Sequence, residues 1–140
     1  MTSDRLILIA ENDPDMAALL LWHLGRLGHR TVAVPDGRTA VRRAFDQQPD
    51  LLILDLMLPE LHGFTVCQIL KHSRRTQQIP ILIVTAANTA EKRQIGLRLG
   101  ANDFVGKPVA MPDLIQRVES LLLRHNPGST SSPICNSPVA

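Results

Sequence analysis

Four apolar segments of this chain are each followed directly by residues whose side chains could do chemistry. The segments are residues 6–10, 51–54, 81–84 and 103–106. The polar residues that follow them are, in chain order, Glu11, Asn12, Asp13, Asp55, Thr85 and Lys107. Carboxylates, a hydroxyl and an ammonium could together bind a divalent cation and accept a phosphoryl group.

The acidic residues of this set predict a cation site beside a nucleophile. Carboxylates that lie close together repel one another unless a cation intervenes, and Mg²⁺ prefers a few protein oxygens with several waters. Asp55 could attack a phosphoryl group and form an aspartyl phosphate. The Lys107 ammonium and Mg²⁺ would stabilise the transferring oxygens, and the Thr85 hydroxyl could bond one of them after transfer.

These residues can meet only if the apolar segments form one parallel sheet. A fifth strand is predicted at residues 31–34. The strands at 6–10, 51–54 and 81–84 lack alternation of apolar and polar residues, which is typical of strands covered on both faces. Ligands of open α/β sheets bind beyond the carboxyl ends of the strands. The pattern therefore predicts a site at one edge of a parallel sheet.

Amphipathic segments between the strands predict five helices. Asp13 is the expected N-cap of the first helix, with Pro14 at its first position and Gly28 at its end. The apolar stripe of this helix consists of Met16, Leu19, Leu20, Leu24 and Leu27. The other helices are expected at about 37–48, 64–72, 89–99 and from just after Pro112. Five β-then-α units joined by short loops predict a doubly wound α/β domain.

Length and composition indicate one ordinary domain. The chain has 140 residues, of which 44% are apolar and 20% charged. Residues 1–125 are predicted to form the domain, whereas residues 126–140 are rich in Ser and Pro and are predicted to be a disordered tail or linker. The two cysteines, Cys67 and Cys135, make no disulfide framework, which favours reduced thiols in a cytoplasmic protein.

The charge pattern argues against direct binding to nucleic acid, and the hydropathy pattern argues against a membrane segment. The net charge is +2, and the basic residues are scattered rather than gathered in a stripe. Aromatic residues make up 3% of the chain, too few for a base-stacking platform. We expect no signal peptide, no membrane-spanning run and no helix-turn-helix after residue 125.

In combination, the motifs of this chain resemble the response regulator receiver domain, the CheY-like family of two-component signalling. The resemblance covers about residues 5–124. It rests on the acidic cluster after the first strand and on the segments LDLMLPELHG, VTA and GANDFVGKP. It implies a flavodoxin-like fold, which is a doubly wound five-stranded parallel sheet in the order 2-1-3-4-5 with five helices.

The resemblance also implies a role for each matching residue. Asp55 would be the phosphoacceptor, and Lys107 would meet the phosphoryl group. The peptide bond from Lys107 to Pro108 would be cis. Thr85 and Phe104 would form the switch, in which the hydroxyl moves toward the phosphoryl group and the ring turns inward.

The implied metal site departs from the family at one position. Its ligands would be Glu11, Asn12, Asp55 and the backbone carbonyl of Met57. Asn12 stands where the family usually has its main metal-ligating aspartate, so we expect weaker Mg²⁺ binding, because an amide oxygen brings no charge. Asp13 could compensate, or could simply cap the first helix. Ala86 is small and would leave room for the phosphoryl group.

The family resemblance implies a signalling protein rather than an enzyme. The partners would be a sensor histidine kinase or phosphotransfer protein, and a downstream output domain or protein. Phosphorylation would shift the population of conformations at the surface of the fourth helix, fifth strand and fifth helix. A homodimer could form through the same surface.

Three other functions fit parts of the pattern. An aspartyl phosphatase would need a second acid two residues after the nucleophile, where Met57 stands. A flavodoxin would need a phosphate-binding loop after the first strand, where the acidic segment ENDPD would repel phosphate. The main alternative is a receiver-like protein-binding module that works without phosphorylation because of Asn12.

Overall fold

The computed structural model describes residues 5–124, which contain a five-stranded parallel sheet. The strands are β1 (Leu6–Ala10), β2 (Arg30–Val34), β3 (Leu51–Leu54), β4 (Ile81–Thr85) and β5 (Asp103–Gly106). Their order across the sheet is β2-β1-β3-β4-β5, and every neighbouring pair is parallel. The predicted sheet and its strand order are confirmed.

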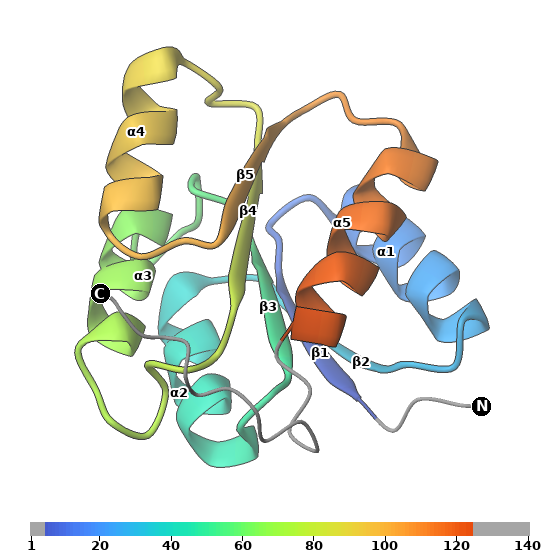
Figure 1. Ribbon diagram of the computed structural model, residues 1–140, viewed down its shortest axis with the longest axis horizontal. Helices are drawn as coiled ribbons and strands as arrows, with labels where there is room; N and C mark the ends of the chain where they lie inside the picture. The colour runs from blue at the N-terminus through green and yellow to red at the C-terminus, as the bar shows by residue number, and fades with distance from the viewer. Residues whose placement is uncertain (1–4, 125–140) are drawn as a thin grey trace.

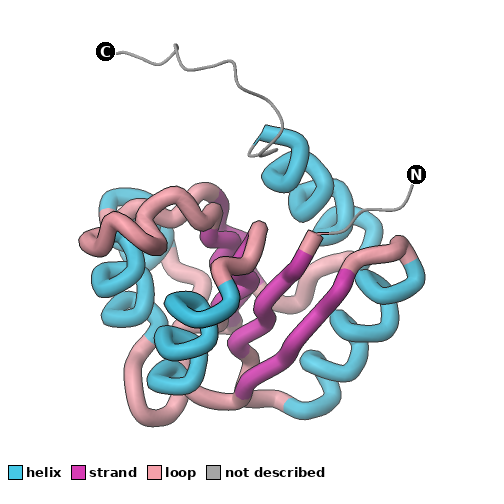
Figure 2. The backbone as a smooth tube through the Cα atoms, turned by 90° about the horizontal axis from the view of Figure 1, so that it is seen from below, coloured by secondary structure: helices cyan, strands magenta, loops and turns pink. Residues whose placement is uncertain are grey.

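Five helices cover this sheet on both faces. They are α1 (Pro14–Arg26), α2 (Gly37–Gln47), α3 (Gly63–Lys71), α4 (Ala90–Arg98) and α5 (Met111–Arg124). Helices α2, α3 and α4 lie on one face of the sheet, and α1 and α5 lie on the other (Figure 1). The view turned by 90° shows helices on both sides of the strands (Figure 2). The described part of the chain is therefore the doubly wound domain that the sequence predicts.

The position of the strands between two helical layers explains why their sequences do not alternate. Every residue of β1, β3 and β4 is buried. Along β1, Ile7 and Ile9 belong to the core beneath α1 and α5, whereas Leu8 belongs to the core beneath the other three helices. Both faces of the strand are thus apolar, because both faces meet helices.

Local signals mark the ends of the helices. Asp13 caps α1 as predicted, since its carboxylate accepts a hydrogen bond from the Asp15 amide at 3.0 Å. Gly28 and Gly100 follow α1 and α4 with φ angles of +92° and +111°, a left-handed conformation that favours glycine. The boundaries therefore follow from capping chemistry that is visible in the sequence.

Two details of the helices differ from the sequence prediction. Helix α5 begins at Met111, so Pro112 lies inside its first turn, where the missing N–H of proline has no intrahelical acceptor to lose. The stripe predicted for α1 is only partly buried. Leu24 lies in the core, whereas Leu19 and Leu27 are 45% and 47% exposed, because the core covers a narrower face of the helix than its periodicity allows.

A buried histidine joins the turn after α1 to a half-exposed glutamate on α5. His29 is 7% exposed, and it follows the turn after α1. Its Nε2 atom lies 2.9 Å from Oε2 of Glu119, which is 90 residues away on α5. This contact fixes the turn after α1 against α5.

Some predictions concern residues that the structure does not describe. The predicted tail, residues 126–140, lies outside the described residues, and so does Cys135. Cys67 is a free cysteine in the core. Within residues 5–124, no helix is both long enough and apolar enough to cross a membrane.

Two glycines offer a matched test of packing beside the site. A Cβ atom at Gly63 would lie 2.6 Å from the Cα of Leu56 and 2.7 Å from the carbonyl oxygen of Asp55, whereas a Cβ at Gly25 would meet nothing within 4 Å. We expect Gly63→Ala to lower the free energy of unfolding by roughly 1–3 kcal/mol, because backbone atoms must shift. Gly25→Ala should raise it by up to about 1 kcal/mol through helix propensity. Urea denaturation measures both changes, and equal effects of the two substitutions would contradict the prediction.

Candidate functional site

The polar residues that follow β1, β3 and β5 meet at the carboxyl edge of the sheet. The Lys107 ammonium lies 3.0 Å from Oε1 of Glu11 and 3.1 Å from Oδ2 of Asp55. The side chains of Glu11 and Asp55 are only 4% and 9% exposed, and that of Lys107 is 20% exposed. Three charged groups from three strand ends therefore form one largely buried cluster, as the sequence predicts.

Asp55 is held in its ionised form at the centre of this cluster. Its Oδ1 atom accepts a hydrogen bond from the Met57 amide at 3.1 Å, and its Oδ2 atom faces Lys107. Burial alone would raise the pKa of Asp55. Hydrogen bonds from the Met57 amide, the Thr85 hydroxyl and Lys107 outweigh burial and hold this pKa below its ordinary value. A carboxylate that stays ionised is available as a nucleophile.

The pKa values of Glu11 and Lys107 are both raised in this cluster, but for different reasons. Burial raises the pKa of Glu11 above its ordinary value, although hydrogen bonds from the Asp13 amide and from Lys107 oppose that shift. Burial would lower the pKa of Lys107, but its hydrogen bonds to Glu11 and Asp55 outweigh burial and raise it. The lysine is therefore a permanent cation between two carboxylates.

The predicted metal ligands supply oxygen atoms, but only two carboxylates. Asn12 is exposed, and the Asp13 carboxylate serves as the cap of α1. Within residues 5–124, no three His, Cys, Asp or Glu side chains form a group that could hold a metal ion. The oxygens of Glu11 and Asp55 nevertheless converge on a single cation, the Lys107 ammonium. A hard divalent ion suits such a set when an amide and a backbone carbonyl complete it.

The two predicted switch residues lie on neighbouring strands, two register positions apart, since Thr85 pairs with Gly106 and Phe104 with Ile83. Thr85 and Phe104 are both fully buried. The Thr85 oxygen accepts a hydrogen bond from the Ala87 amide at 3.1 Å, and its hydroxyl also bonds Asp55. The Phe104 ring lies in the core beneath α2, α3 and α4. Both side chains therefore already occupy, without phosphorylation, the positions that the resemblance implies for the switched state: the hydroxyl toward Asp55 and the ring inward.

The peptide bond after Lys107 and two exposed side chains complete the surroundings of Asp55. The Lys107–Pro108 peptide bond is cis, as the family resemblance implies. Ala86 is exposed beside the site, and Met57 is 57% exposed.

His62 caps α3, since its Nδ1 atom accepts a hydrogen bond from the Phe64 amide at 3.0 Å. The sequence reasoning missed this cap, because the usual N-cap residues are Ser, Thr, Asp and Asn.

An apolar groove opens beside the charged cluster. It has a volume of about 400 Å³ and is bordered by Lys107 and Ala86. Its apolar lining includes Met16 and Leu19 of α1 and Met111 of α5. We call this surface the α1 groove. It offers a partner an apolar contact area directly next to Asp55 and Lys107.

Sequence comparison identifies the class of protein that this fold and site define. Residues 7–119 match the sequence model of the response regulator receiver domain. This chain belongs to the response regulator receiver domain family of two-component signalling. Proteins of this family are signalling modules that act with histidine kinases and output domains.

Two curated relatives are transcriptional regulators of greater length. The chain is 39% identical over 118 residues to the DNA-binding dual master transcriptional regulator RpaA of Synechocystis sp., covering 84% of this chain and 49% of RpaA. It is 33% identical over 133 residues to the alkaline phosphatase synthesis transcriptional regulatory protein PhoP of Bacillus subtilis, covering 95% of this chain and 55% of PhoP. The chain thus spans about half the length of these relatives.

A solved structure resembles this one over nearly its whole length. It is the receiver domain of the sensor histidine kinase PA1611 from Pseudomonas aeruginosa, determined with a magnesium ion coordinated in its active site cleft. The TM-score is 0.78 at 28% identity, and the match covers 86% of this chain and 98% of that one. The agreement supports the receiver fold independently of the sequence motifs.

The His62 cap predicts a loss of stability in acid. Burial and the nearby Lys92 lower the pKa of His62, so the folded protein binds its proton more weakly than the unfolded chain does. The stabilisation by the cap is therefore present above the ordinary histidine pKa and is lost as the pH falls through the lowered one. We expect a loss of about 0.5–1 kcal/mol, measured as the urea midpoint against pH. His62→Asn should remove this part of the pH dependence, and an unchanged profile would contradict the assignment.

Proposed function

We propose that this receiver domain accepts a phosphoryl group on Asp55 with the help of Mg²⁺. The observation that carries the proposal is the environment of Asp55. This carboxylate is 7% exposed and ionised, and it receives hydrogen bonds from Met57, Thr85 and Lys107 at the end of a central strand. Such rigid support suits a nucleophile, because little reorganisation is needed during transfer.

The transfer itself is a displacement at phosphorus. An oxygen of Asp55 forms a bond to phosphorus while the bond between phosphorus and the donor, a phosphohistidine or a small phosphoryl compound, breaks and its electron pair leaves with the donor. Lys107 can turn from the carboxylates toward the incoming phosphoryl oxygens. The Thr85 hydroxyl, which already forms a hydrogen bond with Asp55, is placed to donate a hydrogen bond to one of those oxygens.

Mg²⁺ would be held by Glu11, Asn12, Asp55 and the backbone carbonyl of Met57, and would neutralise charge on the phosphoryl oxygens. The amide of Asn12 leaves the site with one carboxylate fewer than the family usually has. We infer weaker binding of the ion rather than its loss, because Glu11 and Asp55 still converge on one cation. The Asp13 carboxylate is an auxiliary candidate, although it already caps α1.

The partners that we propose follow from the surfaces around the site. The α1 groove lies next to Lys107 and exposes Leu19, so it suits the helices of a sensor histidine kinase or phosphotransfer protein. The surface of α4, β5 and α5 would carry the signal from Thr85 and Phe104 to an output domain, or to a second copy of the chain. Both curated relatives are transcriptional regulators, so DNA binding is proposed only for an output domain and not for this one. Family membership supports a cytoplasmic location and a signalling rather than an enzymatic role.

Intact mass spectrometry tests the phosphoacceptor directly. The protein is incubated with acetyl phosphate, with Mg²⁺ or with a chelator. We expect one phosphoryl adduct that depends on Mg²⁺ and that Asp55→Asn abolishes. Asp46→Asn, a change at an exposed aspartate on α2, is the matched control and should keep the adduct. A folded protein that gains no adduct at any Mg²⁺ concentration would instead favour the phosphorylation-independent binding module.

The Asn12 position predicts a gain of metal affinity on substitution. Asn12→Asp adds one negative charge beside Glu11, and we expect the dissociation constant for Mg²⁺ to fall roughly tenfold. Isothermal titration of the unphosphorylated protein measures the change. Asn102→Asp adds the same charge just before β5, at the opposite edge of the sheet, and should leave the affinity unchanged. Equal affinities for Asn12→Asp and the natural protein would show that residue 12 does not contact the ion.

A further inference from the structure

Helix α4 is held to the sheet by fewer buried side chains than the other helices. Gly96 is its one buried residue, whereas α3 buries four residues and α5 buries four. Leu97 on α4 is 42% exposed. Elements with few buried apolar contacts open most readily. The position of α4 therefore depends on the few contacts that surround Gly96.

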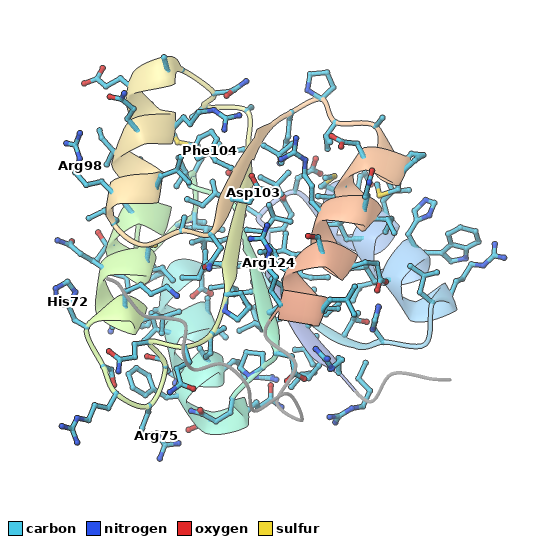
Figure 3. The ribbon with its side chains drawn as sticks, in the orientation of Figure 1. His72, Arg75, Arg98, Asp103, Phe104 and Arg124 are labelled. Atoms are coloured by element: carbon cyan, nitrogen blue, oxygen red, sulfur yellow. The ribbon has the colours of Figure 1, made fainter. Side chains whose placement is uncertain are left out.

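The contact beneath Gly96 is the ring of Phe104. A Cβ atom at Gly96 would lie 3.3 Å from Cδ2 and 3.5 Å from Cε2 of Phe104, and 3.0 Å from Cδ1 of Ile83. Because glycine has no side chain, the backbone of α4 rests almost directly on the ring. The ring itself is fully buried between β5 and this helix (Figure 3). The aromatic switch residue is thus part of the surface on which α4 sits.

A second residue of α4 covers the same ring from the solvent side. The Cζ atom of Arg93 lies 5.4 Å from the centroid of the Phe104 ring, in the arrangement of a cation–π contact. Arg93 precedes Gly96 by three residues, so the two lie on one face of the helix. Since Arg93 is exposed and Phe104 is not, the guanidinium lies between the ring and the solvent.

The loop before α4 is fitted to β5 in a similar way. The side chain of Asn88 fills the space in which a side chain at Gly106 would lie. Gly106 follows Phe104 by two residues, so both are on the same face of the strand. It is also the register partner of Thr85 on β4. The loop and the helix therefore both rest on β5, at Gly106 and at Phe104.

We propose that Arg93 and Gly96 form a clamp on the Phe104 ring, and that this clamp fastens α4 to the sheet. Arg93 is then a positioning residue: it holds the ring inward and, through the ring, holds the helix. The proposal rests on the proposed function only in taking Phe104 as the switch residue. The clamp is tested in the unphosphorylated protein. Its failure would therefore leave phosphorylation of Asp55 unaffected, and a failure of phosphorylation would leave the clamp unaffected.

Native-state hydrogen exchange of the unphosphorylated full chain tests the clamp. The variant is Arg93→Gln, which removes the charge but keeps a long side chain and a good helix propensity. We expect the amides of α4 to exchange about two- to fivefold faster, the size expected of an exposed cation–π contact, while those of α1 and α5 are unchanged. The matched control is Arg98→Gln, on the outer side of the same helix (Figure 3), which should leave exchange at the natural rate.

The aromatic partner completes the test. Phe104→Leu keeps an apolar side chain but removes the ring face, so it should also accelerate exchange in α4. In that background Arg93→Gln should add nothing, because the guanidinium has lost its partner. The proposal is overturned if Arg93→Gln leaves α4 exchange unchanged, if Arg98→Gln has the same effect, or if Arg93→Gln acts equally with and without the ring.

Discussion

The ion pairs of Lys107 with Glu11 and Asp55 are the interaction on which the rest of the site depends. Two carboxylates that are nearly removed from water would repel one another strongly without a cation between them. The ammonium of Lys107 supplies that cation at 3.0 and 3.1 Å. The three residues follow β1, β3 and β5, so the cluster exists only because these strands are parallel and end at one edge.

The same cluster also sets the charge at this edge of the sheet. Two carboxylates and one ammonium carry a net charge of one negative unit. The neutral side chain of Asn12 does not change this charge. One oxygen atom of Glu11 and one of Asp55 point to the same ammonium nitrogen. Lys107 therefore marks the point toward which the oxygens of both carboxylates are directed.

The face of the domain that carries α4 is packed more loosely than the charged edge of the sheet. Asp55 and Lys107 follow strands packed between two cores, whereas α4 touches the sheet mainly through one glycine. Thr85 and Phe104 connect the two regions, because they lie on adjacent strands and face the same core as α4. If these two residues act as the proposed switch, a small change at the end of β4 would reach α4, which buries a single residue. This contrast between a rigid site and a lightly held helix suits a switch.

The sequence by itself determined the strands, the parallel sheet and the residues at its carboxyl edge. Runs without alternation need helices on both faces, and polar residues at the ends of such strands must then converge. Only the tertiary structure decided that Leu19 and Leu27 are exposed, that His29 pairs with Glu119, and that Arg93 covers Phe104. Periodicity shows which residues can share a face of a helix. How much of that face is covered, and by which distant residue, depends on how the layers pack, and that is a property of the whole fold.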